Sequence, residues 1–311
     1  MKIVILEPLG VQEEYLKKLL APIAIKHEIV YYSDRKEDAK SLIDRAEDAD
    51  IVVLTNFPFT REVMEHCPKL KYICVAFTGY NHIDMDYCRG KGIVVSNCAG
   101  YSTDAVAELV FGLVFDLYRH ISEYDKKTRN MGTKGNLVLH EIKGKKFGII
   151  GMGTIGQRVA AIANAFGADV YYWSRNRKNL PYQYLELDDV LKNCDIISIH
   201  LAQNSDTVGL ISKERIALMK KNAILINTAR GPIVDSEALA NALNEGLIAG
   251  AGIDVYETEP PMINHPLLSC KNTILLPHIG FYTEEALEKR AIIVKDNLEG
   301  YLHDQLINVV S

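Results

Sequence analysis

Three ionisable side chains in the second half of the chain have the types and positions needed for carbonyl chemistry. Arg230, Glu259 and His278 each follow a short apolar run, and prolines or glycines flank all three. Arginine can bind a carboxylate through two parallel hydrogen bonds and polarise an adjacent carbonyl group. Histidine can give or take the proton that accompanies reduction of that carbonyl, and a neighbouring glutamate would orient its ring. Taken singly, each residue also fits a surface charge, a capping residue or a core histidine.

A glycine motif at 151–156 indicates what the second reactant is. Four residues suited to a buried strand, 147–150, lead directly into G-x-G-x-x-G, and a helical stretch follows. Gly151 allows the tight turn, Gly153 lets backbone approach a pyrophosphate, and Gly156 lets the helix pack closely on the strand. The helix N-terminus offers N–H groups and a positive dipole end to the phosphates. In this setting the motif predicts a bound nicotinamide or flavin dinucleotide.

The elements that must position these residues form two series of alternating strands and helices. The first series of expected strands is 3–6, 28–32, 51–54, 72–77 and 93–96, and a long helix over 102–121 follows it. The second series begins at residue 147 and continues through 170–173, 196–200, 224–227, 252–255 and 273–276. Such alternation is typical of parallel sheets with helices on both faces. We therefore predict an α/β protein with two doubly wound parallel-sheet domains and a cleft between them, and ligands bind outside the carboxyl ends of such strands.

Bulk properties narrow the class further. A length of 311 residues suits two domains, and the net charge of −5 argues against a nucleic-acid partner. Strand-like sequence begins at residue 2, and the six cysteines form no C-x-x-C pair, so we expect a cytoplasmic protein with reduced thiols and no metal site. The longest apolar stretch, 105–118, is too short to span a membrane. A helix this apolar must be covered on several sides, one of which could be a second subunit.

These motifs together resemble those of the D-isomer-specific 2-hydroxyacid dehydrogenases, over essentially the whole chain. The resemblance rests on N-T-A-R-G at 227–231, the segment 254–260, P-H-I-G at 277–280, G-M-G-T-I-G at 151–156 and V-A-E at 106–108. It implies a split, flavodoxin-like substrate domain made of residues 1–98 plus 287–311, and an inserted Rossmann cofactor domain over 99–286. It also implies a homodimer, held largely through the cofactor domain and the helix at 102–121.

The resemblance assigns roles residue by residue. Arg230 would bind the substrate carboxylate and carbonyl, His278 would be the general acid in reduction, and Glu259 would be its partner. In the first domain, the loop with Thr78 and Gly79 would present backbone N–H groups to the carboxylate, and Tyr101 would line the pocket. The residues expected to bind the cofactor are Gly151, Gly153, Thr154, Ile155, Gly156, Ser174, Arg175, His200, Thr207, Thr228 and Asp254.

One departure from the family pattern bears on the choice of cofactor. NAD-preferring members end the second strand of this fold with an acidic residue that binds the ribose 2′-hydroxyl. Here Ser174 stands at that position, and Arg175 follows it. A carboxylate would repel a 2′-phosphate, whereas a serine and an arginine would bind it. The sequence therefore favours NADP over NAD, with a solvated basic loop as the alternative explanation.

The resulting hypothesis is an NADP-preferring reductase of small 2-oxo acids, most simply glyoxylate or hydroxypyruvate. The D configuration of the product follows only from the resemblance. One alternative is a dinucleotide-sensing binding protein of the same fold, similar to the corepressors among these relatives. Others are an NAD-preferring 2-hydroxyacid dehydrogenase and a formate dehydrogenase, although the latter carries glutamine where this chain has Glu259.

Overall fold

In the computed structural model, which describes residues 1–311, the chain forms two compact units. Unit 1 consists of Met1–Ser102 and Tyr282–Ser311, and unit 2 consists of Thr103–Phe281. The domain boundaries expected from the sequence, 98/99 and 286/287, lie close to the boundaries between the two units, 102/103 and 281/282. Unit 1 is therefore built from both ends of the chain, and unit 2 from one continuous segment.

Unit 1 contains a five-stranded parallel sheet in the order β2-β1-β3-β4-β5. Its strands are β1 (Lys2–Ile5), β2 (Glu28–Tyr31), β3 (Ile51–Leu54), β4 (Tyr72–Val75) and β5 (Val94–Asn97). Its helices are α1 (Glu13–Ala24), α2 (Ala39–Ala46), α3 (Arg61–Glu65), α4 (Met85–Lys91) and α11 (Glu284–Leu302). This strand order is that of flavodoxin-like sheets, which confirms the predicted fold class for this unit.

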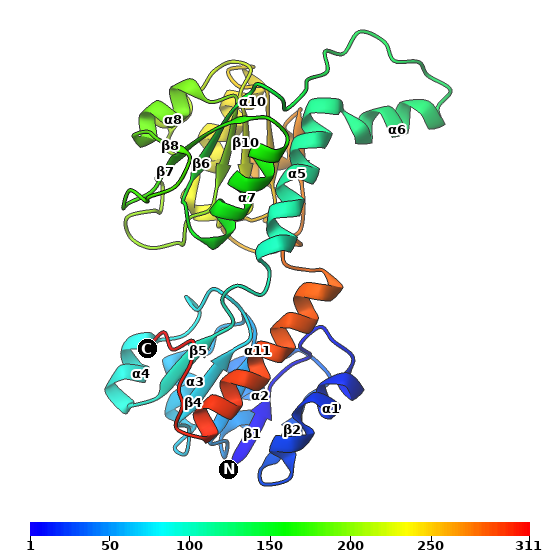
Figure 1. Cartoon of the computed structure of the whole chain (residues 1–311). Coiled ribbons are helices and arrows are strands. Elements are labelled where there is room, and N and C mark those ends of the chain that lie inside the picture. The colour runs from blue at the N-terminus through cyan, green and yellow to red at the C-terminus, as the bar shows by residue number, and fades with distance from the viewer. The chain divides into compact units, whose positions relative to one another are not determined.

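The last part of the chain completes the core of unit 1. Helix α11 packs along β4 and beside α1 (Figure 1). Asn297, which is buried, donates its side-chain amide to the carbonyl oxygen of Asn97 at 2.9 Å. The ring of Tyr301 stacks on that of Tyr72, with 4.2 Å between the centroids. The N-terminal strands of unit 1 thus share one core with residues from the opposite end of the sequence.

Unit 2 contains a seven-stranded parallel sheet in the order β12-β11-β10-β9-β6-β7-β8. Its strands are β6 (Lys146–Ile150), β7 (Asp169–Trp173), β8 (Gln183–Tyr184), β9 (Ile196–Ile199), β10 (Ile224–Asn227), β11 (Gly250–Ile253) and β12 (Thr273–Leu275). The strand order reverses between β6 and β9, so this is the topological switch point of a Rossmann sheet with one added edge strand. The predicted Rossmann fold is confirmed.

Helices cover both faces of the unit 2 sheet. The α-helices are α5 (Thr103–Arg119), α6 (Ile121–Arg129), α7 (Thr154–Ala165), α8 (Leu187–Asn193), α9 (Lys213–Ile216) and α10 (Ser236–Asn244). There are two short 3₁₀ turns, η1 (Gly231–Ile233), which follows β10, and η2 (Pro266–Ser269), which precedes β12. One apolar core lies between the sheet and the neighbouring helices α5 and α7, and the other lies under α8, α9 and α10 (Figure 1).

The glycine-rich strand β11 departs from the sequence prediction. We expected a strand over 252–255, but β11 spans Gly250–Ile253. A Cβ on Gly252 would lie 3.0 Å from Cβ of Leu113 on α5 and 3.0 Å from Cδ1 of Ile226 on β10. The close approach of α5 leaves little room for a side chain here, and three of the four residues of β11 are glycine or alanine, which carry a weak strand signal.

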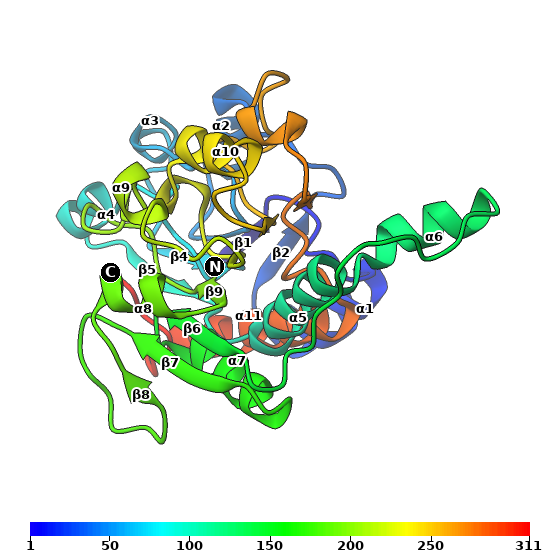
Figure 2. The same cartoon turned by 90° about the horizontal axis from the view of Figure 1, so that it is seen from above.

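The helix expected over 102–121 corresponds to α5, and a second helix, α6, follows it directly. His120 has a left-handed backbone (φ 50°) that ends α5 and starts α6 in a new direction. Helix α6 has no buried residue, and with the loop after it α6 extends away from the body of unit 2 in both views (Figures 1 and 2). No helix of the chain combines the length and the apolar character that crossing a bilayer requires.

Candidate active site

The turn after β12 carries His278 in a constrained conformation. His278 has a left-handed backbone (φ 56°), a conformation that is uncommon for non-glycine residues. Its Nδ1 lies 2.6 Å from Oε2 of Glu259, which is on the loop after β11. Burial of Glu259 raises the pKa of its carboxyl group, but the hydrogen bond and charge of His278 outweigh this and leave the pKa below its usual value. The two predicted partners are therefore in contact.

Asp254 fixes the backbone of this turn through its carboxylate. Its Oδ1 accepts the backbone N–H of Ile279 at 2.8 Å, and its Oδ2 accepts that of Gly280 at 2.8 Å. The side chain is buried, and burial raises the pKa of Asp254 in spite of these two hydrogen bonds. We expected Asp254 to face the cofactor, and the structure shows both its oxygens engaged in fixing the backbone next to His278.

Arg230 stands in a turn after β10 that the chain also fixes by side-chain hydrogen bonds. Asn227 donates to the carbonyl oxygen of Arg230 at 2.9 Å and accepts from the backbone N–H of Ala229 at 3.0 Å. Arg230 follows β10 and Glu259 follows the adjacent parallel strand β11, so the two lie at the same edge of the sheet, and the charge of Arg230 contributes to the lowered pKa of Glu259. All three residues predicted to perform chemistry are thus presented at the carboxyl ends of β10, β11 and β12.

The glycine motif forms a bare turn between β6 and α7. A Cβ on Gly151 would lie 2.5 Å from the carbonyl oxygen of His200, and one on Gly156 would lie 2.1 Å from that of Gly151. By contrast, a Cβ on Gly153 would meet no atom within 4 Å. Gly153 caps α7 without a side chain, so Thr154 and Ile155 begin a helix whose first N–H groups have no side-chain partner. This open, donor-lined turn fits a pyrophosphate.

The other residues predicted to contact the cofactor lie along the same edge. The hydroxyl of Thr228, at the end of β10, is buried and has no hydrogen-bond partner, so this position suits a polar group of a bound molecule. Thr207 instead uses its hydroxyl within its own loop, donating to the carbonyl oxygen of Ala202 at 2.8 Å. His200 contacts the hydroxyl of Ser198 through Nε2 at 2.8 Å, and burial lowers the pKa of its ring to about 3.

Ser174 and Arg175 follow β7, next to the glycine turn. The carbonyl oxygen of Trp173 accepts the backbone N–H of Gly151 at 2.9 Å, which joins the two turns. Ser174 is buried and donates to the carbonyl oxygen of Asn176 at 2.7 Å. The guanidinium of Arg175 is largely exposed and lies 3.2 Å from Oδ2 of Asp206. No acidic residue ends this strand, as the sequence indicated.

Comparison with known proteins agrees with this geometry. The family model described as "D-isomer specific 2-hydroxyacid dehydrogenase, NAD binding domain" matches residues 111–280, which include the glycine turn and all three catalytic candidates. The chain belongs to this family. It is therefore an oxidoreductase with a nicotinamide dinucleotide as its cofactor.

Relatives of this dehydrogenase match it along most of its length. A hydroxypyruvate reductase of Blautia hydrogenotrophica is 36% identical, and the match covers 91% of both chains. A glyoxylate reductase of Thermococcus litoralis is 38% identical, again over 91% of both chains. The solved structure of an acyclic imino acid reductase (Bsp5) in complex with NADPH and D-Arg superposes with a TM-score of 0.92, at 32% identity over the whole of both chains.

The residues of the dehydrogenase that we expected to contact substrate from the first domain lie in unit 1. The carbonyl oxygen of Thr78, which precedes Gly79 in the loop after β4, accepts a hydrogen bond from Asn97 at 2.7 Å. Tyr101 is buried against Phe77, with 6.2 Å between the rings, and burial raises its pKa to about 12. Loop and tyrosine therefore meet at one edge of the unit 1 sheet.

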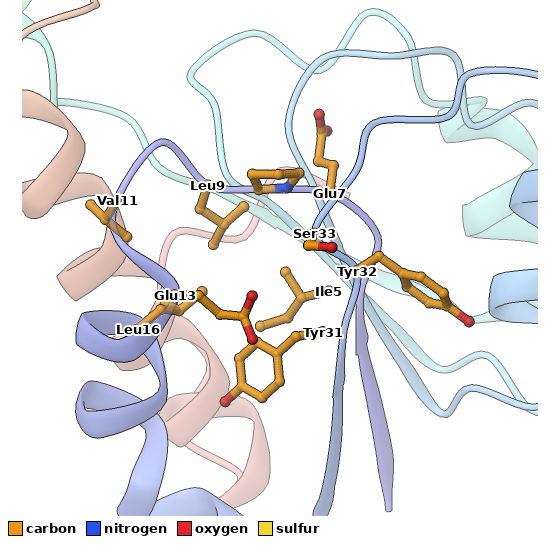
Figure 3. Close-up of a pocket in the computed structure, with 10 residues that line it drawn as sticks. Ile5, Glu7, Leu9, Val11, Glu13, Leu16, Tyr31, Tyr32 and Ser33 are labelled. Atoms are coloured by element: carbon orange, nitrogen blue, oxygen red, sulfur yellow. The ribbon is translucent and has the colours of Figure 1, made fainter.

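Unit 1 of the dehydrogenase also contains a small cavity of about 180 Å³ (Figure 3). It lies at the carboxyl ends of β1 and β2, next to the start of α1. Of its two carboxylates, Glu7 pairs with Arg35 at 2.6 Å, and Glu13 pairs with Lys17 at 2.5 Å. Because these charges are satisfied within the chain, we assign the cavity no ligand.

One cluster beside the catalytic residues was missed by sequence reasoning. Glu257, between Asp254 and Glu259 in sequence, contacts Ser236 at the start of α10 and His265 just before η2. The three residues come from separate elements, and no spacing pattern marks them. The only local signal is the His265-Pro266 pair, which is typical of a helix start and says nothing about Glu257.

Proposed function

We propose that this enzyme reduces glyoxylate or hydroxypyruvate to the corresponding 2-hydroxy acid with NADPH. The observation that carries the proposal is the Glu259–His278 pair, 2.6 Å apart, at the sheet edge that also presents Arg230. An acid, its orienting carboxylate and a carboxylate-binding guanidinium are the groups that reduction of a 2-oxo acid requires. The relatives named glyoxylate reductase and hydroxypyruvate reductase support the substrate class.

In this mechanism each side chain has one task. A nicotinamide dinucleotide held at the glycine turn of 151–156 would supply the hydride that reduces the carbonyl carbon. Because Nδ1 of His278 donates to Glu259, the proton for the carbonyl oxygen comes from Nε2. Arg230 binds the substrate carboxylate and polarises the carbonyl. In unit 1, the corresponding proposal is that the loop at Thr78 and Gly79 presents backbone N–H groups to a carboxylate.

The preference for NADPH rests on the end of β7. Ser174 stands there in place of an acid, so no carboxylate opposes a 2′-phosphate. The guanidinium of Arg175 is exposed, so it could leave its ion pair with Asp206 and bind that phosphate instead. The NADPH bound in the related imino acid reductase supports the same preference. Preference for NADH is the alternative.

The test is oxidation of NADPH and NADH against a panel of 2-oxo acids of increasing side-chain size. We expect the highest kcat/KM with NADPH and with glyoxylate or hydroxypyruvate. The panel should be repeated with each acid plus ammonia, because the imino acid reductase is so similar in structure. A large preference for a bulkier acid, or rates that appear only with ammonia, would show that the substrate assignment is wrong.

We further propose that the enzyme is a homodimer. Most apolar side chains of α5 are buried within unit 2, which leaves the arm formed by α6 and residues 130–141 as the uncovered element. The arm exposes Met131, Val138 and Leu139, with 92%, 71% and 43% of their surfaces accessible. Exposed apolar residues on an extended arm are typical of a subunit interface. A monomer in sedimentation equilibrium at micromolar concentration would contradict this.

A further inference from the structure

We propose that Glu257, held between Ser236 and His265, is a positioning residue that sets the place of Glu259 and hence of the His278 ring. The inference rests on the proposed roles of Glu259 and His278, and assigns Glu257 no contact with substrate or cofactor. It is carried by a continuous set of contacts through the loop after β11, all of them within unit 2.

Both oxygens of Glu257 are engaged by different elements. Ser236, the first residue of α10, donates its hydroxyl to Oε1 at 2.6 Å. His265, which caps η2, contacts Oε2 through Nε2 at 2.9 Å. These two hydrogen bonds outweigh the effect of burial, so the pKa of Glu257 lies below its usual value and the side chain is a carboxylate at neutral pH. The loop is thus tied at Glu257 to a helix start and to a second turn.

His265 is itself held rigidly. Its side chain is 6% exposed, and its ring meets that of Tyr256 edge to face, at 5.3 Å and 86°. A carboxylate can only accept, so Nε2 of His265 carries the proton in this hydrogen bond. Nδ1 is buried and has no partner, so no second hydrogen bond could hold the ring in its place if Glu257 were removed.

Tyr256 transmits this restraint to Glu259. The backbone N–H of Tyr256 donates to Oε1 of Glu259 at 3.2 Å, and Oε2 of the same carboxylate is the atom that contacts His278. The peptide between Tyr256 and Glu257 packs directly on Gly231, where a Cβ would lie 2.1 Å from the carbonyl carbon of Tyr256. The peptide could therefore move only away from Gly231. The hydrogen bonds of the Glu257 side chain oppose that movement.

If Glu257 had a purely structural role, its removal would have a different effect from the removal of a positioning residue. Loss of a residue with a purely structural role lowers the free energy of unfolding and leaves the rate of the folded enzyme unchanged. Loss of a positioning residue displaces Glu259, so the folded enzyme transfers the proton less well. A misplacement of about 1 Å can cost roughly a hundredfold in rate. The two cases separate when kcat is measured on enzyme whose folding has been verified.

The experiment compares Glu257→Ala with Glu257→Gln and with a control, Glu237→Gln. Glutamine can donate to Ser236 and accept from His265, so it preserves both contacts, whereas alanine removes both. Glu237 is exposed on α10, the helix that Ser236 begins. Its variant therefore removes one negative charge without altering the loop after β11. We expect Glu257→Ala to lower kcat ~10–100-fold, with the Kd for NADPH unchanged within about twofold.

Two further readouts identify the route through Glu259. In Glu257→Ala the loss should appear in kcat, with the KM for the 2-oxo acid changed little, because Arg230 is untouched. Glu257→Gln should recover most of kcat, and Glu237→Gln should match the parent. Should Glu257→Ala fail to fold, Ser236→Ala removes one of the two anchors and should lower kcat severalfold.

Parental kcat in folded Glu257→Ala, or in Ser236→Ala where that variant is used, would overturn the proposal, whatever the loss of stability. Failure of the proposed function is a different result. It would be seen as a parent enzyme inactive on every 2-oxo acid, or as a fully active His278→Ala variant.

Discussion

The two halves of the unit 2 sheet, on either side of the switch point between β6 and β9, hold their functional groups by different means. Next to β6 and β7 the groups are backbone N–H groups, kept open because Gly151 and Gly156 have no side chains. At the ends of β10, β11 and β12 they are side chains, each oriented by other residues such as Asp254 and Glu259. The first half should therefore determine which cofactor binds, and the second should determine how fast the reaction proceeds.

The largest effect should come from His278 in the catalytic half. His278→Ala should lower kcat by ~10²–10⁴-fold, the range for a lost general acid, because no other proton donor replaces Nε2. The Kd for NADPH should change little, since the glycine turn is untouched. The measurement is steady-state kinetics together with fluorescence titration of NADPH. Near-normal turnover would remove His278 from the mechanism and would break the division between the two halves.

Arg230→Lys should have the next largest effect. Lysine keeps the positive charge but loses the planar fork, so the two parallel hydrogen bonds to a carboxylate become one. We expect kcat/KM for the 2-oxo acid to fall ~10–100-fold, which corresponds to the loss of one charge-assisted hydrogen bond. A lysine variant as efficient as the parent would show that two-point recognition is the wrong description.

Substitutions at the end of β7 should change cofactor choice and leave the chemistry intact. Ser174→Asp should repel the 2′-phosphate and move preference toward NADH by roughly tenfold or more. Arg175→Ala should weaken NADPH with little effect on NADH. The measurement is kcat/KM for both cofactors in the parent and in each variant. A parent that already prefers NADH severalfold would contradict the assignment to NADP.

His200, at the border of the two halves, should affect stability more than rate. Burial lowers the pKa of His200 to about 3 in the folded chain. Below pH ~6.5 the imidazole is therefore protonated in the unfolded chain but stays neutral in the folded chain. Stability is full above pH ~6.5, and roughly 1–2 kcal/mol should be lost by pH 5. His200→Gln should flatten this dependence, whereas a control variant at the exposed His303 should not. The only tryptophan, Trp173, reports urea unfolding of unit 2.

Much of the fold was predictable because the local signals agreed with the global arrangement. Short apolar strands alternated with helices, and the glycine motif stood between a strand and a helix, as it does in the structure. The same alternation placed Arg230, Glu259 and His278 at strand ends. Strand β11 was misplaced because its sequence is determined by the approach of α5 rather than by strand propensity.

The remaining features depend on contacts that no local pattern records. The turn that contains the left-handed backbone of His278 is held by Asp254, which follows another strand, β11. The Ser236–Glu257–His265 cluster joins three elements through side-chain geometry alone. Similarly, the separate helix α6 begins directly after His120, where the sequence shows neither glycine nor proline. Such features become visible only when the tertiary structure is known.

The construction of unit 1 from both ends of the chain has a consequence for synthesis on the ribosome. Unit 2 is continuous and can fold as soon as it has emerged, whereas β1–β5 must wait for α11. Until then the ring of Tyr72 and the carbonyl oxygen of Asn97 lack the partners that Tyr301 and Asn297 provide. The nascent chain should therefore carry an unfinished first domain through almost the whole of translation, and loss of the last helix should leave the N-terminal part exposed to chaperones and proteases.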